Sequence, residues 1–207
     1  MIKLKNKKII MLGAGGHARV LYDVILINNI NVYAVADTSS YLHKTFSSLV
    51  HICSDENIEK KLLPEKYDVI NAIGMVPGKK ISLRKNLYDF YKSRGYSFVS
   101  VLHPSAIISQ SSKISEAVNV MAGCIIQANT EIYENSIINT GVKIDHDCII
   151  GKNVHIASGV TLCGNVKVSD NSFIGAGVVV LPGTVIPSNS IIPAGDVLKN
   201  KYFKNDK

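Results

Sequence analysis

The hexapeptide IDHDCI, residues 144–149, places a histidine between two aspartates in an otherwise aliphatic stretch. An imidazole titrates near neutral pH and a neighbouring carboxylate raises its basicity, so His146 and Asp147 form a candidate general base and its partner. The same pattern is expected of polar residues on a solvated turn that have no catalytic role. The choice between the two interpretations depends on the elements that position these side chains.

Those elements follow from a repeat. From Ile108 to Val197 the chain divides into fifteen consecutive hexads, and each begins with Ile, Val or Leu. A six-residue period fits neither an α-helix nor a hairpin meander. The fourth position is Gly or Asn in twelve of the fifteen hexads, and these residues tolerate positive φ most readily. The pattern predicts short strands with positions five and one inward, joined by tight corners into a triangular parallel β-helix of five coils.

The chain before the repeat is expected to form an α/β unit. The predicted elements are a strand at 8–12, a glycine turn and helix, a strand ending at residue 37, a strand at 67–73, a helix at 80–94 and a strand at 98–101. About a hundred residues can hold only half of a doubly wound dinucleotide fold. This favours a mononucleotide, such as the UDP of a sugar nucleotide, over a whole NAD.

A glycine motif in this first unit indicates phosphate binding. Gly13, Gly15 and Ala18 fit the G-x-G-x-x-G/A spacing, and Asp37 lies near the place of the ribose-binding carboxylate in nucleotide folds. His17 and the turn amides are then candidates to hold a phosphate at a helix N-terminus. The alternative is a purely structural turn in which His17 is a solvated residue at the start of the helix.

Composition excludes several classes of protein. The net charge is +7, but lysines concentrate at the two ends, and acidic residues outnumber basic ones in the repeat. A basic stripe for nucleic acid is therefore not expected. The sequence shows neither a signal-peptide core nor an apolar stretch long enough to span a bilayer, so we expect a cytoplasmic protein without a membrane partner. The four cysteines form no CxxC pair and are expected to be reduced.

Several motifs together resemble one family. GAGGHA near the start, AIG at 72–74, HPSA at 103–106 and the uninterrupted hexads resemble the bacterial sugar O- and N-acyltransferases, which include UDP-4-amino-sugar N-acetyltransferases and sialic acid O-acetyltransferases. The resemblance implies a Rossmann-like nucleotide-sugar-binding domain at 1–101, a left-handed parallel β-helix at 102–198 and a tail at 199–207. It also implies a trimeric enzyme that uses acetyl-CoA.

The resemblance implies roles for single residues as well. His146 matches the general base and Asp147 its carboxylate, although the amino-sugar enzymes have Glu at that place. His155, nine residues later, matches a histidine that contacts acetyl-CoA. Because the strand at 148–150 separates the two histidines within one chain, a site with both would combine two subunits. Gly164 lies one coil above His146, where its amide would stabilise the thioester oxygen.

Other residues are expected to bind the two substrates. The pantetheine arm is assigned to Ala176 and Ala194, and the nucleotide sugar to Gly15, Gly16, His17, Asp37, Thr38 and Gly74. A metal site is not expected.

The predicted function is acetyl transfer from acetyl-CoA to the amino group of a nucleotide-linked amino sugar, in surface polysaccharide or glycan biosynthesis. An O-acetyltransferase acting on sialic acid is an alternative that the sequence does not separate from it. A non-catalytic nucleotide-sugar binding module would keep the glycine motif but would not need His146. A zinc carbonic anhydrase would need three histidine ligands, and the repeat has only two. A solenoid used only as a scaffold or an ice-binding surface is the remaining alternative.

Overall fold

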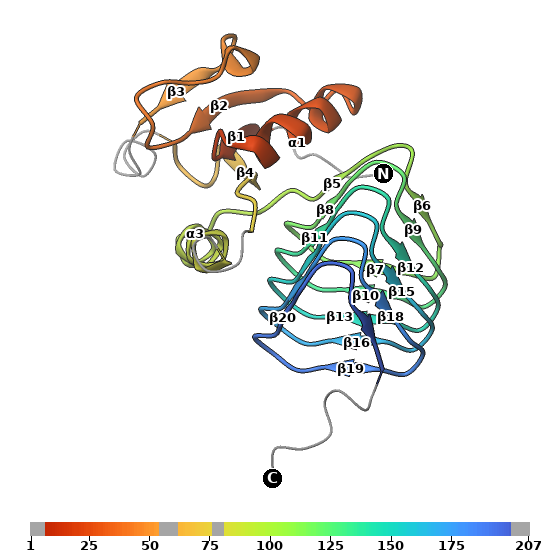
Figure 1. The fold of residues 1–207 in the computed structure, drawn as a ribbon. Coiled ribbons are helices and arrows are strands. Elements are labelled where there is room, and N and C mark those ends of the chain that lie inside the picture. Colours follow the sequence, from red (N-terminus) through yellow and green to blue (C-terminus); the bar gives the residue numbers. More distant parts are fainter. Residues whose placement is uncertain (1–6, 54–61, 76–80, 200–207) are drawn as a thin grey trace. The chain divides into compact units, whose positions relative to one another are not determined.

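The computed structural model describes residues 7–53, 62–75 and 81–199 and divides the chain into two compact units between Val101 and Leu102. The first unit contains a parallel four-stranded sheet of order β3-β2-β1-β4 (Figure 1). Its elements are β1 (Lys8–Leu12), α1 (Gly16–Ile27), β2 (Val32–Ala36), the 3₁₀ helix η1 (Lys44–Phe46), β3 (Val50–Ile52), β4 (Tyr67–Asn71) and α3 (Ile81–Ser93).

The apolar strand β1 lies in the middle of this sheet and pairs with both β2 and β4. Four of its five residues are buried, as expected of a parallel strand covered on both faces. Strand β3 was not anticipated, because it is short and none of its three side chains is buried. It nevertheless pairs with β2 in parallel and forms one edge of the sheet.

The prediction of a further strand at 98–101 was wrong. Phe98 forms an isolated bridge with Val69 of β4, and Val101 belongs to β5 (Val101–Leu102), the first strand of the second unit. The segment touches the first sheet at one point and then enters the solenoid. Residues 98–101 therefore do not form one strand: the first residue pairs with the sheet of the first unit, and the last one belongs to a sheet of the solenoid.

The second unit is a parallel β-solenoid with three faces, which contain five, six and six strands (Figure 1). Each face is named here by one of its strands: the β12 face, the β13 face and the β14 face. The strands after β5 are β6 (Ile107–Ile108), β7 (Lys113–Ile114), β8 (Asn119–Val120), β9 (Ile125–Ile126), β10 (Glu131–Ile132), β11 (Ile137–Ile138), β12 (Lys143–Ile144), β13 (Ile149–Ile150), β14 (His155–Ile156), β15 (Thr161–Leu162), β16 (Lys167–Val168), β17 (Phe173–Ile174), β18 (Val179–Val180), β19 (Val185–Ile186), β20 (Ile191–Ile192) and β21 (Val197–Leu198).

The corners follow the hexad pattern. Every fourth-position residue from Ala117 to Gly195 has a φ between 54° and 81°. Glycine and asparagine occupy most of these positions, because they enter the left-handed region at the lowest cost. Asp147 is one of the two other residues in the set, with a φ of 58°. Its position is thus explained by the backbone alone, and any catalytic role must be argued from its side chain.

The core of the solenoid is formed by positions five and one of the hexads, as predicted. Several buried fifth-position side chains carry a hydroxyl or thiol, and each donates to a carbonyl fifteen residues further on. The pairs are Cys124 to Asn139, Thr130 to Asp145, Ser136 to Gly151, Cys148 to Cys163 and Ser172 to Pro187. Each bond links the interior of one coil to a corner of the coil above, so these five polar side chains keep a hydrogen bond inside the solenoid. Thr184, also at a fifth position, is buried without a hydrogen-bond partner among the described residues.

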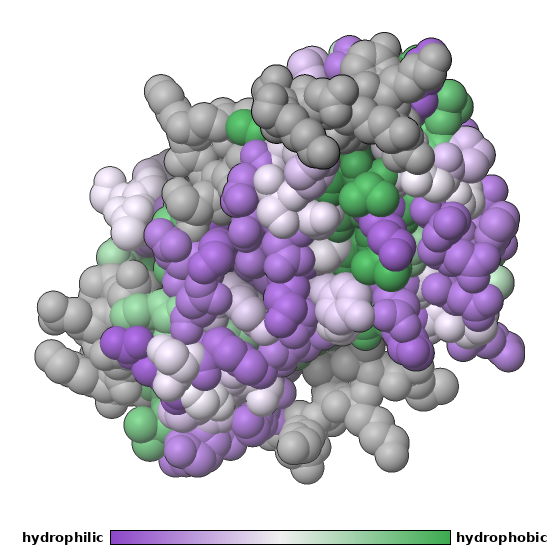
Figure 2. All heavy atoms as spheres, turned by 90° about the horizontal axis from the view of Figure 1, so that it is seen from below, coloured by the Kyte–Doolittle hydropathy of each residue, from purple (hydrophilic) through white to green (hydrophobic). Residues whose placement is uncertain are grey.

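The outward residues of one column differ in their exposure. Ile137 and His155 are buried, Phe173 is partly buried and Ile191 is exposed. Hydrophilic side chains dominate the face of the molecule in Figure 2, where apolar side chains gather in a smaller area. In the described part of the chain, no helix has the length and apolarity needed to cross a membrane.

Candidate active site

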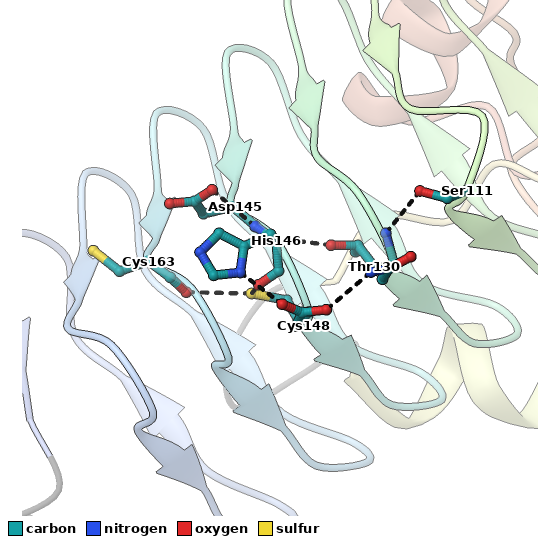
Figure 3. Close-up of polar contacts among 8 residues, drawn as sticks. Ser111, Thr130, Asp145, His146, Cys148 and Cys163 are labelled. Carbon is teal, nitrogen blue, oxygen red and sulfur yellow. Dashed lines mark hydrogen bonds and ion pairs between the residues drawn. The ribbon is translucent and has the colours of Figure 1, made fainter.

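His146 lies on the corner between β12 and β13, and its imidazole is paired with Asp147 (Figure 3). The Nδ1 atom of His146 lies 2.7 Å from Oδ2 of Asp147. A carboxylate accepts, so Nδ1 carries the proton and Nε2 of the neutral ring has a free lone pair. The shorter aspartate therefore reaches the imidazole at the place where the amino-sugar enzymes have glutamate. The main-chain N–H of His146 donates to Oδ1 of Asp145 at 2.8 Å.

Two carboxylates raise the pKa of His146. The hydrogen bond that His146 donates to Asp147 raises the pKa of His146 above its usual value, and the negative charge of Asp145 adds to the effect. Conversely, the bond to His146 lowers the pKa of Asp147, and a second bond, from Asn129, lowers it further. Both side chains of the pair are more than half exposed, so solvent screens these interactions. The result is an accessible imidazole of increased basicity, which suits a general base.

Gly164 lies against the reactive edge of the imidazole. A Cβ atom at residue 164 would be 2.7 Å from both Cε1 and Nε2 of His146. The glycine therefore leaves room for the ring, which a larger residue would displace. Its carbonyl accepts from the N–H of Gly183 at 3.0 Å, whereas its own N–H donates to no acceptor among the described residues. Gly164 itself is buried beneath the imidazole.

The coil below supports the corner at two points. Thr130 Oγ1 donates to the carbonyl of Asp145 at 3.0 Å, and Asn129 Nδ2 donates to Oδ1 of Asp147 at 3.2 Å (Figure 3). Sequence reasoning did not assign a role to Asn129. The signal was present, because Asn129 precedes Asp147 by one eighteen-residue coil and so occupies the same corner column.

The cysteine beside this corner does not suit nucleophilic catalysis. The Cys148 side chain points into the core, and its thiol donates to the carbonyl of Cys163 at 3.2 Å (Figure 3). Burial raises the pKa of the Cys148 thiol to about 11, so the thiolate is scarce at neutral pH. The geometry favours direct chemistry at His146 over a covalent intermediate on this cysteine.

The structure does not bring the remaining solenoid candidates to the same corner. His155 lies on the β14 face, where its ring packs edge-to-face on Phe173 with centroids 5.0 Å apart. Ala176 and Ala194 are exposed third-position residues on the corner that joins the β14 and β12 faces. Within one chain, then, His146, Asp147 and Gly164 share one corner, and these three residues lie on other parts of the solenoid.

The first unit contains a separate cavity of about 580 Å³. All six residues assigned to nucleotide-sugar binding line it, and they come from the turn before α1, the end of β2 and the end of β4: Gly15, Gly16, His17, Asp37, Thr38 and Gly74. Sequence reasoning missed the apolar wall that Ile52, Cys53, Leu83 and Leu87 contribute. Those residues follow no motif and meet only in the folded unit.

The carboxylate of Asp37 holds the glycine turn. Its Oδ2 accepts the N–H of Ala14 at 2.7 Å and its Oδ1 accepts the N–H of Ser39 at 2.9 Å. Gly13, with a φ of 94°, could not be replaced without strain, and a Cβ there would overlap Ile73. By contrast, a Cβ at Gly15 meets nothing within 4 Å. The turn is therefore held by Asp37 and packed against Ile73, and it is open toward the cavity at Gly15.

Helix α1 starts at this turn without a side-chain cap. Its N-cap residue, Gly15, provides no side-chain hydrogen bond, and its first turn contains no acidic residue. The first N–H groups of a helix attract anions when no side chain caps them. Among the described residues, no group of three or more His, Cys, Asp or Glu side chains is arranged to hold a metal ion.

A β-solenoid of hexads that carries a histidine–carboxylate pair on an open corner defines a hexapeptide-repeat acyltransferase. Residues 8–89 match the family model described as the PglD N-terminal domain. The acetyltransferase domain of PglB from Neisseria gonorrhoeae is 27% identical, with a TM-score of 0.84 and coverage of 94% of this chain and 92% of that one. PerB from Caulobacter crescentus, solved in complex with CoA and GDP-perosamine, is 31% identical, with a TM-score of 0.83 and coverage of 96% and 91%.

A third structure supports the fold alone. WeeI from Acinetobacter baumannii is 19% identical, with a TM-score of 0.71 and coverage of 92% of this chain and 95% of that one. The identity to PerB over nearly the full length of both chains establishes the family. The chain belongs to the bacterial sugar acyltransferases with hexapeptide repeats.

Proposed function

We propose that the protein transfers an acetyl group from acetyl-CoA to the amino group of a nucleotide-linked amino sugar, in the biosynthesis of a surface polysaccharide or another glycan. The observation that carries the proposal is the His146–Asp147 pair at 2.7 Å, in which the imidazole is more than half exposed and its Nε2 lies beside Gly164. The similarity to PerB, which was solved with CoA and GDP-perosamine, supports the choice of donor and of acceptor class.

The proposed reaction is a direct transfer. The amine nitrogen attacks the thioester carbonyl carbon while Nε2 of His146 accepts a proton from that nitrogen. The negative charge that develops on the carbonyl oxygen is stabilised by the free N–H of Gly164. The C–S bond then breaks, the amide forms, and the CoA thiolate leaves and takes up a proton, from imidazolium or from water.

In this proposal the first unit is a Rossmann-like domain that binds the nucleotide. The strand order β3-β2-β1-β4 and the cavity at the carboxyl ends of β1, β2 and β4 support it, because open parallel sheets bind ligands at that edge. The diphosphate would lie on the amides before α1, beside His17. Asp37 already accepts two main-chain N–H groups, but each oxygen retains a lone pair for a nucleoside hydroxyl.

The acetyl-CoA site is proposed to lie between subunits of a trimer. His146 and Gly164 would come from one chain, and His155 of its neighbour would contact acetyl-CoA. Ala176 and Ala194 would contact the pantetheine arm through their main chains. The separation of the His146 corner from the β14 face supports this arrangement, since one chain by itself does not assemble all five residues.

The test is a transfer assay with acetyl-CoA and a panel of UDP-, GDP- and CMP-linked sugars, including paired amino and hydroxyl forms of each. Free thiol is followed with a colour reagent and the product by mass. We expect thiol release and a mass gain of one acetyl group with an amino form. Transfer to hydroxyl forms alone would establish O-acetylation instead. Binding of a nucleotide sugar with no transfer to any member would favour the non-catalytic module.

A further inference from the structure

We propose that Asn129 is a positioning residue for the acetyl transfer: its side-chain amide orients the carboxylate of Asp147 toward the imidazole of His146. This inference rests on the proposed function, in which His146 is the base. Asn129 touches neither substrate in the proposal and acts through Asp147 alone.

The two oxygens of Asp147 have different partners. Oδ2 accepts from His146 Nδ1 at 2.7 Å, and Oδ1 accepts from Asn129 Nδ2 at 3.2 Å (Figure 3). An aspartate carboxylate turns about one terminal torsion with a broad energy profile. A donor on each oxygen restricts that torsion, so the bond from Asn129 selects the orientation in which Oδ2 faces the ring.

Asn129 is itself held in place. Its main-chain N–H donates to Oγ of Ser111 at 3.0 Å, one coil further down, and its φ of 59° matches the corner on which Asp147 lies. The support therefore runs along a single corner column over three coils, from Ser111 through Asn129 to Asp147. Both Asn129 and Asp147 are exposed, so water would compete for Oδ1 if the amide were absent.

Hydrogen bonds of the same kind occur elsewhere in the solenoid with a purely structural role, and the Asn129–Asp147 bond must be distinguished from them. On another corner, Asn135 Nδ2 donates to Asn153 at 2.8 Å and Asn153 Nδ2 donates to Asn171 at 3.2 Å. These contacts have the same eighteen-residue offset but neutral acceptors, and they serve the stacking of the coils. At Asn129 the acceptor is an ionised carboxylate that is also bonded to an imidazole, and such bonds are stronger than neutral ones.

The electrostatic consequence follows from the groups that face His146. The charged groups that act on its imidazole are Asp147 and Asp145, both on its own corner. The titratable residue on the corner one coil above is Cys163. Of these, Asp147 has the largest effect, and it acts through the hydrogen bond. A carboxylate that turns away from the ring would leave a less basic imidazole.

The test compares Asn129→Gly with Asn165→Gly in the full-length protein. Glycine keeps the positive φ of both corners, so each variant loses only a side chain. Asn165 lies in the same column on the other side of Asp147, and its side chain takes part in no hydrogen bond among the described residues. For Asn129→Gly we expect kcat to fall about threefold to tenfold with unchanged KM for both substrates, as for loss of a partner that acts mainly in the transition state. The acid limb of the rate profile should move to lower pH.

Asn171→Gly is the second control, because it removes a hydrogen bond between neutral side chains with the same eighteen-residue offset. This bond lies on a different corner of the solenoid from His146. Rates and pH profiles equal to those of wild type in both controls, with a change in Asn129→Gly alone, support the inference. An Asn129→Gly enzyme with the wild-type kcat and pH profile overturns it, and so does an equal loss in Asn171→Gly. Neither result affects the proposed function, which the transfer assay tests separately.

Discussion

Nδ1 of His146 lies 2.7 Å from Oδ2 of Asp147, and the opposite edge of the same ring lies against Gly164. The first contact orients the imidazole, and the missing side chain at Gly164 leaves room for the ring. The pair forms at a corner where Asp147 already has the left-handed backbone that the solenoid requires. A residue needed for the turn thus also orients the base, and this relationship leads to the predictions that follow.

Replacement of His146 by alanine should lower kcat by about a hundredfold to ten-thousandfold, the usual effect of losing a general base. Binding of both substrates should change little, because the side chain is exposed and contributes no packing to the core. Steady-state kinetics and titration calorimetry with each substrate would measure the two effects separately. Wild-type activity in this variant would exclude His146 as the base and would make His155 the next candidate.

The two aspartates beside His146 should affect the pH dependence of the reaction rate. Because the pKa of His146 is raised above 6.5, the neutral imidazole is lost as pH falls through that raised pKa, and the acid limb should have its midpoint above 6.5. Asp147→Asn should move the midpoint down and lower kcat by about tenfold to a hundredfold, which is typical for a partner that orients a functional histidine.

Asparagine suits the positive φ of this corner, so the Asp147→Asn variant should unfold at the same temperature as wild type. Rates measured between about pH 5 and 9, around the titration of a histidine, would show the shift. If Asp147 serves only the backbone, the variant will keep both the wild-type rate and the wild-type profile.

Gly164→Ala should displace the imidazole, because the added Cβ would lie 2.7 Å from Nε2 of His146. A displacement of about 1 Å is enough to lower turnover by about a hundredfold when geometry limits the reaction. The matched control is Pro182→Ala, which alters the third-position residue one coil further on. Full activity of Gly164→Ala would mean that the ring has room that the structure does not show.

A composite active site should reveal itself by complementation between inactive subunits. His146→Ala and His155→Ala proteins, unfolded together and reassembled in equal amounts, should regain activity, because some sites combine an intact His146 with the partner's intact histidine. Random mixing in a trimer predicts about one quarter of the wild-type activity. Each variant refolded alone is the control. No recovery in mixed trimers, with assembly verified by sedimentation, would place both histidines in one chain's site. Activity of His155→Ala refolded alone would exclude His155.

Gly15→Val should weaken nucleotide-sugar binding and leave acetyl-CoA affinity nearly unchanged. A Cβ at this position meets no atom of the protein within 4 Å, so the first unit should fold normally while the valine fills the space before α1. Close approach of a diphosphate to the turn amides would then be blocked. Calorimetry with each ligand tests the division of labour, and equal losses for both ligands would contradict it.

Much of the solenoid was predictable from the sequence, because each of its contacts occurs at a fixed offset. A strand pairs with the strand eighteen residues on, as Ile137 does with His155, so the hexads alone determine register, core positions and corners. The column that contains His146 and Gly164 followed from the same arithmetic. The left-handed conformation of Asp147 was likewise expected from its fourth position in the hexad.

The first unit and the orientation of side chains depended on the tertiary structure. The sheet order places β3 beside β2, and the carboxylate of Asp37 accepts the N–H of Ala14. Both contacts join segments that have no periodic relation in the sequence. The burial of His155 was likewise not evident from its outward place in the hexad. The sequence thus determined which residues share a corner, because the repeat sets their spacing. Only the folded structure decided which atoms meet there, including Asn129 with Asp147, because a torsion about a side-chain bond is selected by all of its neighbours at once.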